Sequence, residues 1–364
     1  MNKILNLTIG LVFIFGIIGA QTHPDFTVIN KVKTSTVKSQ DYTGTCWSFA
    51  TTSYIETEAI RNGKPEFDLS EMFFVYQAYL TKGDDYIRFH GKANFSEGGQ
   101  AHDVLNIIRT NGLVPESVFN GINYNSKIHN HSELVKNLQS ILDNVAKSED
   151  KIPQTWKAAF ENVLKGYLGE LPKDFEYNGK TYTPLTFNQE VIQFNPDDYI
   201  EFTSYTHHPY YKAFDLEVPD NWSHDQYYNI PIDELIEIMN YALANGHSID
   251  WDGDMSEKGI NHEKGVNELT AEDYEKIKQS GMIAYRQETF DDFTSTDDHL
   301  MHIIGNAKNK DGKTYFITKN SWGVYNKYDG YIYMSEDFVK IKTIALMVHK
   351  NAVPETIAKK CGLK

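Results

Sequence analysis

The chain has 364 residues, of which 40% are hydrophobic and 23% charged, and its formal net charge at pH 7 is −15. That length is enough for a sizeable core in one large or two smaller domains. The acidic balance argues against nucleic acid or an anionic membrane as the main partner.

Residues 1–20 have the pattern of a secretory signal peptide. Lys3 precedes a largely apolar run over residues 4–18, and the small residues Gly19 and Ala20 follow just before Gln21. The run is short for a spanning helix, although an uncleaved N-terminal anchor is the alternative. Its removal takes away one lysine and no acid, which leaves a net charge of −16. We therefore expect an exported protein, periplasmic or secreted, with no stable membrane insertion after cleavage.

The chain contains two cysteines, Cys46 and Cys361. An exported protein of this size has an oxidising environment available, yet two cysteines build no disulfide framework. The stability of the fold must therefore come from its core. A single bridge between the two would silence Cys46 as a nucleophile, and we favour free thiols.

Residues 39–50 place the amide of Gln40, a glycine turn and the thiol of Cys46 directly before a helix. An extended lead-in over residues 22–37 precedes them. The helical pattern starts with Trp47 and stops at residues 61–63. Cys46 then lies in the first turn, where unpaired N–H groups and the helix dipole favour the thiolate. By position alone, a small buried cysteine is an equally good interpretation.

The middle of the chain predicts further helices. Ser70 caps an apolar helix that runs to residues 82–83, and residues 84–95 look like a loop. Gly98 and Gly99 precede a helix that ends near residue 112, and such a pair either lets a ligand approach the backbone or forms an ordinary turn. Helices are also expected over residues 131–171, with a break at Pro153, and over 231–245. Residues 177–205 alternate as strands do.

Three acids, Asp250, Asp252 and Asp254, suggest calcium, but an EF-hand loop would need glycine and glutamate where Met255 and Asn261 stand. We favour a strand end followed by an acidic loop, and expect no metal or cofactor. The last third of the chain predicts strands, separated by turn signals, over residues 299–307, 313–319, 330–334 and 343–348.

Two residues in the last third complete the chemistry of a cysteine nucleophile. Such a nucleophile needs an imidazole to take its proton and an acceptor to orient that imidazole. His299 and Asn320 supply both. The Cys46 N–H and the Gln40 amide could donate to an oxyanion. Singly, His299 and Asn320 are ordinary residues, and only the combination favours catalysis.

These motifs resemble those of the papain-like cysteine peptidases. Gln40 with residues 44–47, His299 followed by Gly305, and Asn320-Ser321-Trp322-Gly323 stand in that family's order. Residues 97–100 and 111–115 are similar to the bleomycin hydrolase and aminopeptidase C branch. Five shorter blocks share that similarity, over residues 182–195, 231–235, 249–251, 286–290 and 353–355.

The resemblance implies an α+β fold with a papain-like two-lobe architecture. A helical lobe carries the cysteine helix, a β-rich lobe carries the histidine and asparagine, and a helical insertion is added. The predicted divisions are a signal peptide (1–20), the helical lobe (21–125), an insertion that is mainly helical and then extended (126–205), the β-rich lobe (206–350) and a C-terminal tail (351–364).

The resemblance also implies roles for single residues. Cys46 is the nucleophile, His299 the general base and acid, Asn320 the orienting residue and Gln40 the oxyanion donor. Trp322 shields the contact between histidine and asparagine from water.

Further roles concern the substrate. Gly98 and Gly99 offer backbone to an extended peptide, and Asp298 contacts substrate through its backbone. His302 is expected to be structural.

The sequence departs from the family pattern at two places. Thr43 stands where many papain relatives have a disulfide cysteine. In the branch, a C-terminal tail enters the cleft and limits cleavage to the amino end, but here only ten residues follow Pro354. We expect an aminopeptidase acting on peptides through a thioester. An endopeptidase, a catalytically silent peptide-binding homologue and the branch's homo-oligomeric ring stay open.

Overall fold

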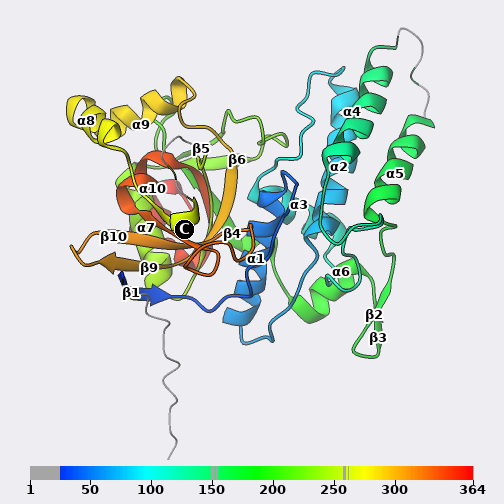
Figure 1. Ribbon diagram of the computed structural model, residues 1–364, viewed down its shortest axis with the longest axis horizontal. Helices are drawn as coiled ribbons and strands as arrows, with labels where there is room; N and C mark the ends of the chain where they lie inside the picture. The colour runs from blue at the N-terminus through cyan, green and yellow to red at the C-terminus, as the bar shows by residue number, and fades with distance from the viewer. Residues whose placement is uncertain (1–24, 149–151, 153–154, 257–259, 261, 364) are drawn as a thin grey trace, which may run out of the picture.

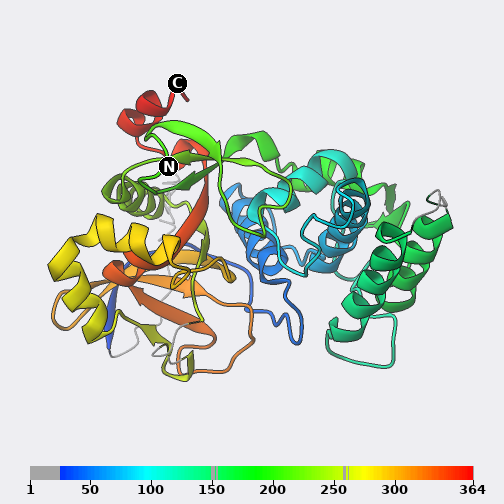
Figure 2. The same cartoon turned by 90° about the horizontal axis from the view of Figure 1, so that it is seen from above.

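The structure, a computed structural model, describes residues 25–148, 152, 155–256, 260 and 262–363. A helical lobe and a β-rich lobe lie side by side, and helix α1 lies between them (Figures 1 and 2). The predicted signal peptide and Pro153 lie outside the described residues. No helix in the described ranges has both the length and the apolar composition needed to cross a bilayer.

The helical lobe packs its helices around one core, which includes Trp47, Phe73 and Leu138. A two-stranded hairpin lies at its edge (Figure 1). Its elements are α1 (Cys46–Arg61), α2 (Glu71–Arg88), α3 (Ala101–Asn111), α4 (Ser132–Ala146), α5 (Thr155–Leu168), β2 (Phe175–Tyr177), β3 (Lys180–Tyr182), α6 (Pro184–Phe187), a π-helical turn (Asn188–Ile192) and a 3-10 turn (Pro196–Asp198).

The β-rich lobe is built on one sheet with the strand order β5-β6-β4-β12-β7-β9-β10-β11-β8, and β1 adds to β9. Neighbours are antiparallel except for the pairs β4–β6 and β8–β11. The strands are β1 (Phe26–Lys31), β4 (Tyr199–Thr203), β5 (Lys212–Asp215), β6 (Gln226–Asn229), β7 (Ile249–Gly253), β8 (Val266–Asn267), β9 (His299–Asn309), β10 (Thr314–Lys319), β11 (Tyr331–Ser335) and β12 (Thr343–His349). The helices are α7 (Ile232–Ala244), α8 (Ala271–Ser280), α9 (Met282–Asp291), α10 (Glu336–Lys342) and α11 (Glu355–Cys361), with 3-10 turns at His262–Lys264 and Lys350–Ala352.

Most predicted elements are confirmed. Helix α1 begins at Cys46, and Ser70 Oγ caps α2 by accepting from Phe73 N at 3.1 Å. The helix over 231–245 and the four late strands are present, and β7 is the expected strand before Asp254.

Other predictions are wrong. Helix α2 does not stop near residue 83 but continues to Arg88. Gly83 serves packing there, because a side-chain carbon would lie 3.0 Å from the Phe160 ring of α5. Residues 177–205 contain only short strands beside helical turns. Helices α8 and α9, which follow further along the chain, were not predicted, and Thr270, through its cap with Asp273, begins the first.

The sheet also takes strands from segments predicted to lie elsewhere. Strand β1 pairs with β9, although residues 21–125 are predicted to form the helical lobe, and β4 comes from the predicted insertion. The remaining predicted divisions stay predictions. The chain thus crosses between the lobes before it reaches α1, which holds the start of that helix against the sheet.

Asp250 joins the lobes from inside the sheet. It is 1% exposed and accepts from Thr51 Oγ1 of α1 at 2.6 Å. Burial raises the pKa of Asp250 to about 8, although the Thr51 hydrogen bond opposes the shift. The folded protein therefore keeps this proton until about pH 8, whereas an unfolded aspartate releases it near pH 4. The contribution of protonated Asp250 to the free energy of unfolding is fully present below pH 4 and is lost as the pH rises towards 8.

We expect Asp250→Asn to remove this pH dependence, because asparagine can still accept from Thr51 but cannot ionise. Between pH 5 and pH 8 the unfolding free energy should fall by about 4 kcal/mol less in the variant than in the unmodified protein. Urea unfolding at both pH values measures the difference. Asp233→Asn on the exposed side of α7 is the matched control, and parallel pH profiles for Asp250→Asn and the unmodified protein would contradict the expectation.

Candidate active site

The N-terminus of α1 presents Cys46 at the boundary between the lobes. Its side chain is buried, and both Cys46 and Cys361 are free thiols. The Leu300 N–H of β9 donates to the sulfur. Cys361 lies in α11, within the core of the β-rich lobe. The structure therefore has no bridge between these two cysteines.

His299 and Asn320 meet on the β-rich side. His299 begins β9, Asn320 follows β10, and the pairing of these strands brings the two residues together. His299 Nε2 lies 2.7 Å from Asn320 Oδ1. The Trp322 ring stacks on the imidazole with centroids 4.7 Å apart and an interplanar angle of 28°. Asn320 Oδ1 also accepts from Ser321 N, so the amide oxygen is the atom that faces the imidazole. The imidazole must then donate a proton from Nε2, which leaves Nδ1 of the neutral ring without a proton.

Gln40 is fixed between the two lobes. Its Oε1 accepts from Ser321 Oγ at 2.6 Å, and its Nε2 donates to Thr43 O at 2.6 Å. The amide has a second Nε2 proton for a ligand. Thr43 Oγ1 donates to Gln40 O at 2.8 Å. The hydroxyl of Thr43 thus closes the turn at the position where many papain relatives carry a disulfide cysteine.

Burial favours the neutral forms of both Cys46 and His299. Burial raises the pKa of the Cys46 thiol well above its usual range; the Leu300 N–H opposes this, and nearby carboxylates add to it. Burial lowers the pKa of His299 to about 4, although the Asn320 hydrogen bond opposes the shift. A neutral thiol and a neutral imidazole are therefore the forms that burial favours at neutral pH.

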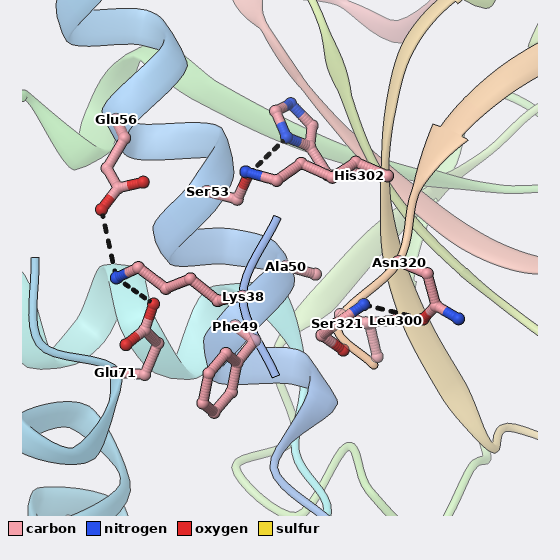
Figure 3. A pocket seen from close by; sticks show the side chains of 11 residues that line it. Lys38, Phe49, Ala50, Ser53, Glu56, Glu71, Leu300, His302, Asn320 and Ser321 are labelled. Carbon is pink, nitrogen blue, oxygen red and sulfur yellow. Dashed lines mark hydrogen bonds and ion pairs between the residues drawn. The ribbon is translucent and has the colours of Figure 1, made fainter. Parts of the chain in front are cut away.

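Lys38, Glu56 and Glu71 form an ionic network next to the site (Figure 3). Lys38 Nζ lies 2.8 Å from Glu71 Oε1 of α2 and 3.6 Å from Glu56 Oε1 of α1. Burial disfavours the charged lysine, but the two glutamates outweigh it and raise the pKa of Lys38. Lys38 stands two residues before Gln40, so the network anchors the segment that carries the amide.

The paired glycines differ in how accessible their backbone is. Lys82 Nζ donates to Gly98 O, and a side-chain carbon at Gly98 would lie 1.8 Å from Asp220 Oδ2. Gly98 nevertheless stays partly exposed, and its role as backbone that binds an extended peptide stays a prediction. Gly99 is buried, and a side-chain carbon there would lie 2.8 Å from Asp103 Oδ2 and 3.0 Å from the Trp47 ring.

The other two predicted residues have clear environments. Asp298 Oδ1 accepts from Met255 N at 2.8 Å, so its side chain is engaged with the loop after β7. His302 is fully buried and lies 2.8 Å from Ser53 Oγ of α1 (Figure 3). It takes no part in the contact between His299 and Asn320, which agrees with a structural role.

The three acids considered for calcium do not converge on one point. Asp250 accepts from Thr51, Asp252 from Gln100, and Asp254 from Thr296. Each carboxylate therefore serves a different partner.

A different group has the spacing of metal ligands. His207 Nε2 and His208 Nε2 lie 3.1 and 2.6 Å from the Glu217 carboxylate. Gln287 Oε1 accepts from Thr206 N, so its Nε2 donates to His207 Nδ1. The His207 proton then sits on Nε2 and points at Glu217, where a metal would need a bare nitrogen. We assign no metal to this group.

Known proteins are similar to this chain in sequence and in fold. A model of the Peptidase C1-like family matches residues 18–362. The chain belongs to that family. Aminopeptidase G of Lactobacillus delbrueckii subsp. lactis is 22% identical over 363 residues, covering 88% of this chain and 82% of the relative. Bleomycin hydrolase of Rattus norvegicus is 23% identical over 374 residues, with the same two shares.

The crystal structure of PepW from Lactobacillus rhamnosis HN001 has the same fold, with a TM-score of 0.73 and 22% identity. The match covers 94% of this chain and 85% of PepW. These comparisons confirm the predicted α+β, papain-like fold class. As a member of the Peptidase C1-like family, this chain is a papain-like cysteine peptidase.

Sequence reasoning missed the acidic surroundings of Cys46. Asp220, Asp252 and Asp297 all act on its thiol. Asp297 stands two residues before His299, and Gln100 follows the glycine pair, so both were within reach of the motifs. Asp220 carries no sequence signal, because its loop reaches the site only through the fold.

Proposed function

We propose that this chain is a cysteine aminopeptidase that removes residues from the amino end of peptides. The observation that carries the proposal is the His299–Asn320 hydrogen bond of 2.7 Å, stacked against Trp322 and placed beside the helix that begins at Cys46. Cysteine, imidazole and orienting amide are the groups that acyl transfer through a thioester needs. The names of the relatives aminopeptidase G and bleomycin hydrolase support the proposal.

In the proposed mechanism, His299 Nδ1 takes the thiol proton, while the Nε2–H of His299 keeps its hydrogen bond to Asn320 Oδ1. The Cys46 sulfur attacks the peptide carbonyl, and the oxyanion accepts from the Cys46 N–H and from the free Gln40 Nε2 proton. The imidazolium then protonates the leaving amine, so the C–N bond breaks and a thioester remains. Water, deprotonated by His299, hydrolyses the thioester and returns the thiol. In this proposal the backbone of Gly98 and Gly99 and the backbone of Asp298 contact the peptide.

The position of the chain end favours a second candidate, an endopeptidase. Helix α11 packs its buried face into the β-rich core, and Lys360 pairs with Glu234 of α7 at 2.7 Å. Within the described residues, no hydrogen bond, ion pair or ring contact joins 353–363 to Cys46, His299 or Asn320. A tail that stops the peptide inside the cleft is therefore not seen.

The products separate the two candidates. An aminopeptidase should shorten a decapeptide one residue at a time from its free amino end, and the N-acetylated form should stay intact over the same period. Mass spectrometry of a time course measures this. Internal fragments from the acetylated peptide would establish the endopeptidase instead.

Labelling tests the enzyme against a silent peptide-binding homologue. We expect an epoxide inhibitor of thiol peptidases to add its mass to Cys46 in the reduced, folded protein, because ring opening needs the activated thiolate. The matched control is His262→Asn, which alters a second histidine against Trp322 but keeps the nucleophile. Absence of labelling in folded protein would refute the enzyme proposal.

We further propose that the protein is exported, on the apolar run over residues 4–18 and the small residues before Gln21. N-terminal sequencing of the protein from the periplasm or medium should then start at Gln21. A chain that keeps residues 1–20 and sediments with membranes would indicate the uncleaved anchor.

A further inference from the structure

Lys319 is a buried lysine that connects the two lobes next to the site. It ends strand β10, and Asn320 follows it directly. The residue is 5% exposed, and its Nζ donates to Ser53 Oγ of α1 at 2.7 Å and to Ser35 Oγ of the lead-in segment at 3.0 Å. One side chain therefore joins the strand that precedes the orienting asparagine to the helix that begins at the nucleophile.

The partners of Lys319 are themselves held in place. Ser35 Oγ donates to Oε2 of buried Glu56 at 2.5 Å. Because Ser53 Oγ accepts from the lysine, its own proton is free for His302 Nδ1, which lies 2.8 Å away on β9 (Figure 3). The ammonium group is thus surrounded by fixed groups from α1, the lead-in segment and β9.

The charge of Lys319 is costly in this position. Burial lowers its pKa to about 8, Lys38 adds to the lowering, and Glu56 and Glu71 oppose it. An apolar side chain in place of a buried charge and its partner often gives a fold of equal or higher stability. Stability alone is therefore a poor reason for a lysine here. Its two short hydrogen bonds instead set how far β10 lies from α1.

The separation of β10 and α1 also governs the distance that the proposed chemistry needs. Cys46 and Ser53 lie seven residues apart in α1, about two helical turns, so both are on the face towards the β-rich lobe. On the other side of the boundary, Asn320 Oδ1 holds His299 Nε2 at 2.7 Å. A displacement of Lys319 relative to α1 would therefore move His299 relative to Cys46.

Asn320 is held through both of its neighbours in the chain. Lys319 precedes it, and Ser321, which follows it, donates from Oγ to Gln40 Oε1 at 2.6 Å. A cavity beside these residues measures about 10 Å³, and Lys319, Asn320 and Ser53 are part of its lining. That volume is too small for a side chain to move into, so the lysine has a single position.

We propose that Lys319 is a positioning residue, which acts through Ser53 of α1 to hold Cys46 at the distance from His299 that proton transfer requires. The proposal rests on the proposed peptidase function and adds a residue to its mechanism. Among the described residues, the Nζ of Lys319 binds the two serines and neither Cys46 nor His299. Its removal would therefore change the geometry of the pair without removing a reacting group.

Lys319→Met tests this role, because methionine has a similar length but neither charge nor donor. We expect kcat on an unblocked peptide to fall about 10-fold or more and KM to change by less than about 3-fold, since the groups that bind the peptide stay in place. Alkylation of Cys46 by iodoacetamide at pH 7, followed by mass spectrometry, should also slow about 10-fold. The matched control is Lys313→Met just before β10, where Lys313 pairs with Glu268 at 3.1 Å. It should change kcat by less than about 2-fold.

Ser53→Ala tests the route through α1. It keeps the lysine but removes its contact with the helix, and it should lower kcat about 5-fold. Because the two residues act as a unit, Lys319→Met combined with Ser53→Ala should lose no more than Lys319→Met alone, within about 2-fold. Unchanged kcat and alkylation in the folded single variants, a change in KM alone, or additive losses in the double variant would overturn the proposal.

The two single variants also cover a failure to fold. Urea unfolding of each variant shows whether it is folded, and Ser53→Ala decides the test if Lys319→Met is not. Absence of peptide hydrolysis by the unmodified protein would refute the proposed function. The ratio of alkylation rates between the variants and the unmodified protein would still decide the role of Lys319.

Discussion

Replacing Cys46 with alanine should lower peptide hydrolysis by about 10⁴-fold or more, to the level of the uncatalysed background. No other group at the site can form the thioester, because Cys361 is buried in the core of the β-rich lobe. Initial rates on an unblocked peptide with a fluorogenic leaving group measure the loss. Residual turnover within 100-fold of the unmodified enzyme would contradict the assignment of Cys46.

The control for that prediction is structural. Cys46 is the first residue of α1, and its side chain takes part in no capping bond. We therefore expect the alanine variant to unfold within about 1 kcal/mol of the unmodified protein. Cys361→Ala is the matched cysteine variant and should retain activity. A loss of activity that follows a loss of fold would not count against the nucleophile.

Local patterns predicted the elements that carry the chemistry. The start of α1 at Cys46, the Ser70 cap and strand β9 from His299 all follow from short-range signals. The order of Gln40, Cys46, His299 and Asn320 could be read directly, and the fold class followed from it. These features depend on residues close in sequence or on motif order.

The missed features depend on long-range packing. The polar residues Thr51, Ser53 and Glu56 of α1 are all buried against the sheet and the lead-in segment, and no local pattern indicates this. Gly83 looked like a helix end because its contact with Phe160 comes from a distant helix.

The acidic surroundings of Cys46 were missed for the same reason. Asp220 lies 122 residues from Gly98 in the sequence, and it reaches that glycine through a loop held by its own hydrogen bonds. Asn221 Nδ2 binds Leu216 O and Asp225 O within that loop, and Trp222 Nε1 donates to Asp103 of α3. The sequence of this loop does not indicate that Asp220 lies against Gly98. The sequence therefore predicts the nucleophile but not the charges that surround it in the fold.

The second large effect concerns His299. In the structure both members of the pair are neutral, and three carboxyls oppose the thiolate. In the proposed mechanism an imidazolium at His299, with help from the Leu300 N–H and the helix terminus, balances that charge. His299→Ala should therefore lower kcat/KM by about 10³-fold or more and shift the thiol pKa upward. The rate of iodoacetamide alkylation of Cys46, measured from pH 5 to 10, reports the shift.

The direction of the pH effect makes this prediction specific. In the unmodified enzyme, activity should rise as Cys46 transfers its proton and fall as the imidazolium is lost, which gives a bell-shaped profile for the coupled pair. Without His299 the acidic limb of alkylation should move to higher pH, because the carboxyls and burial then act unopposed. His262→Asn, the other histidine against Trp322, should change alkylation by less than about 3-fold. An alkylation profile that is the same with and without His299 would show that the pair does not share a proton, and the proposed mechanism would lose its base.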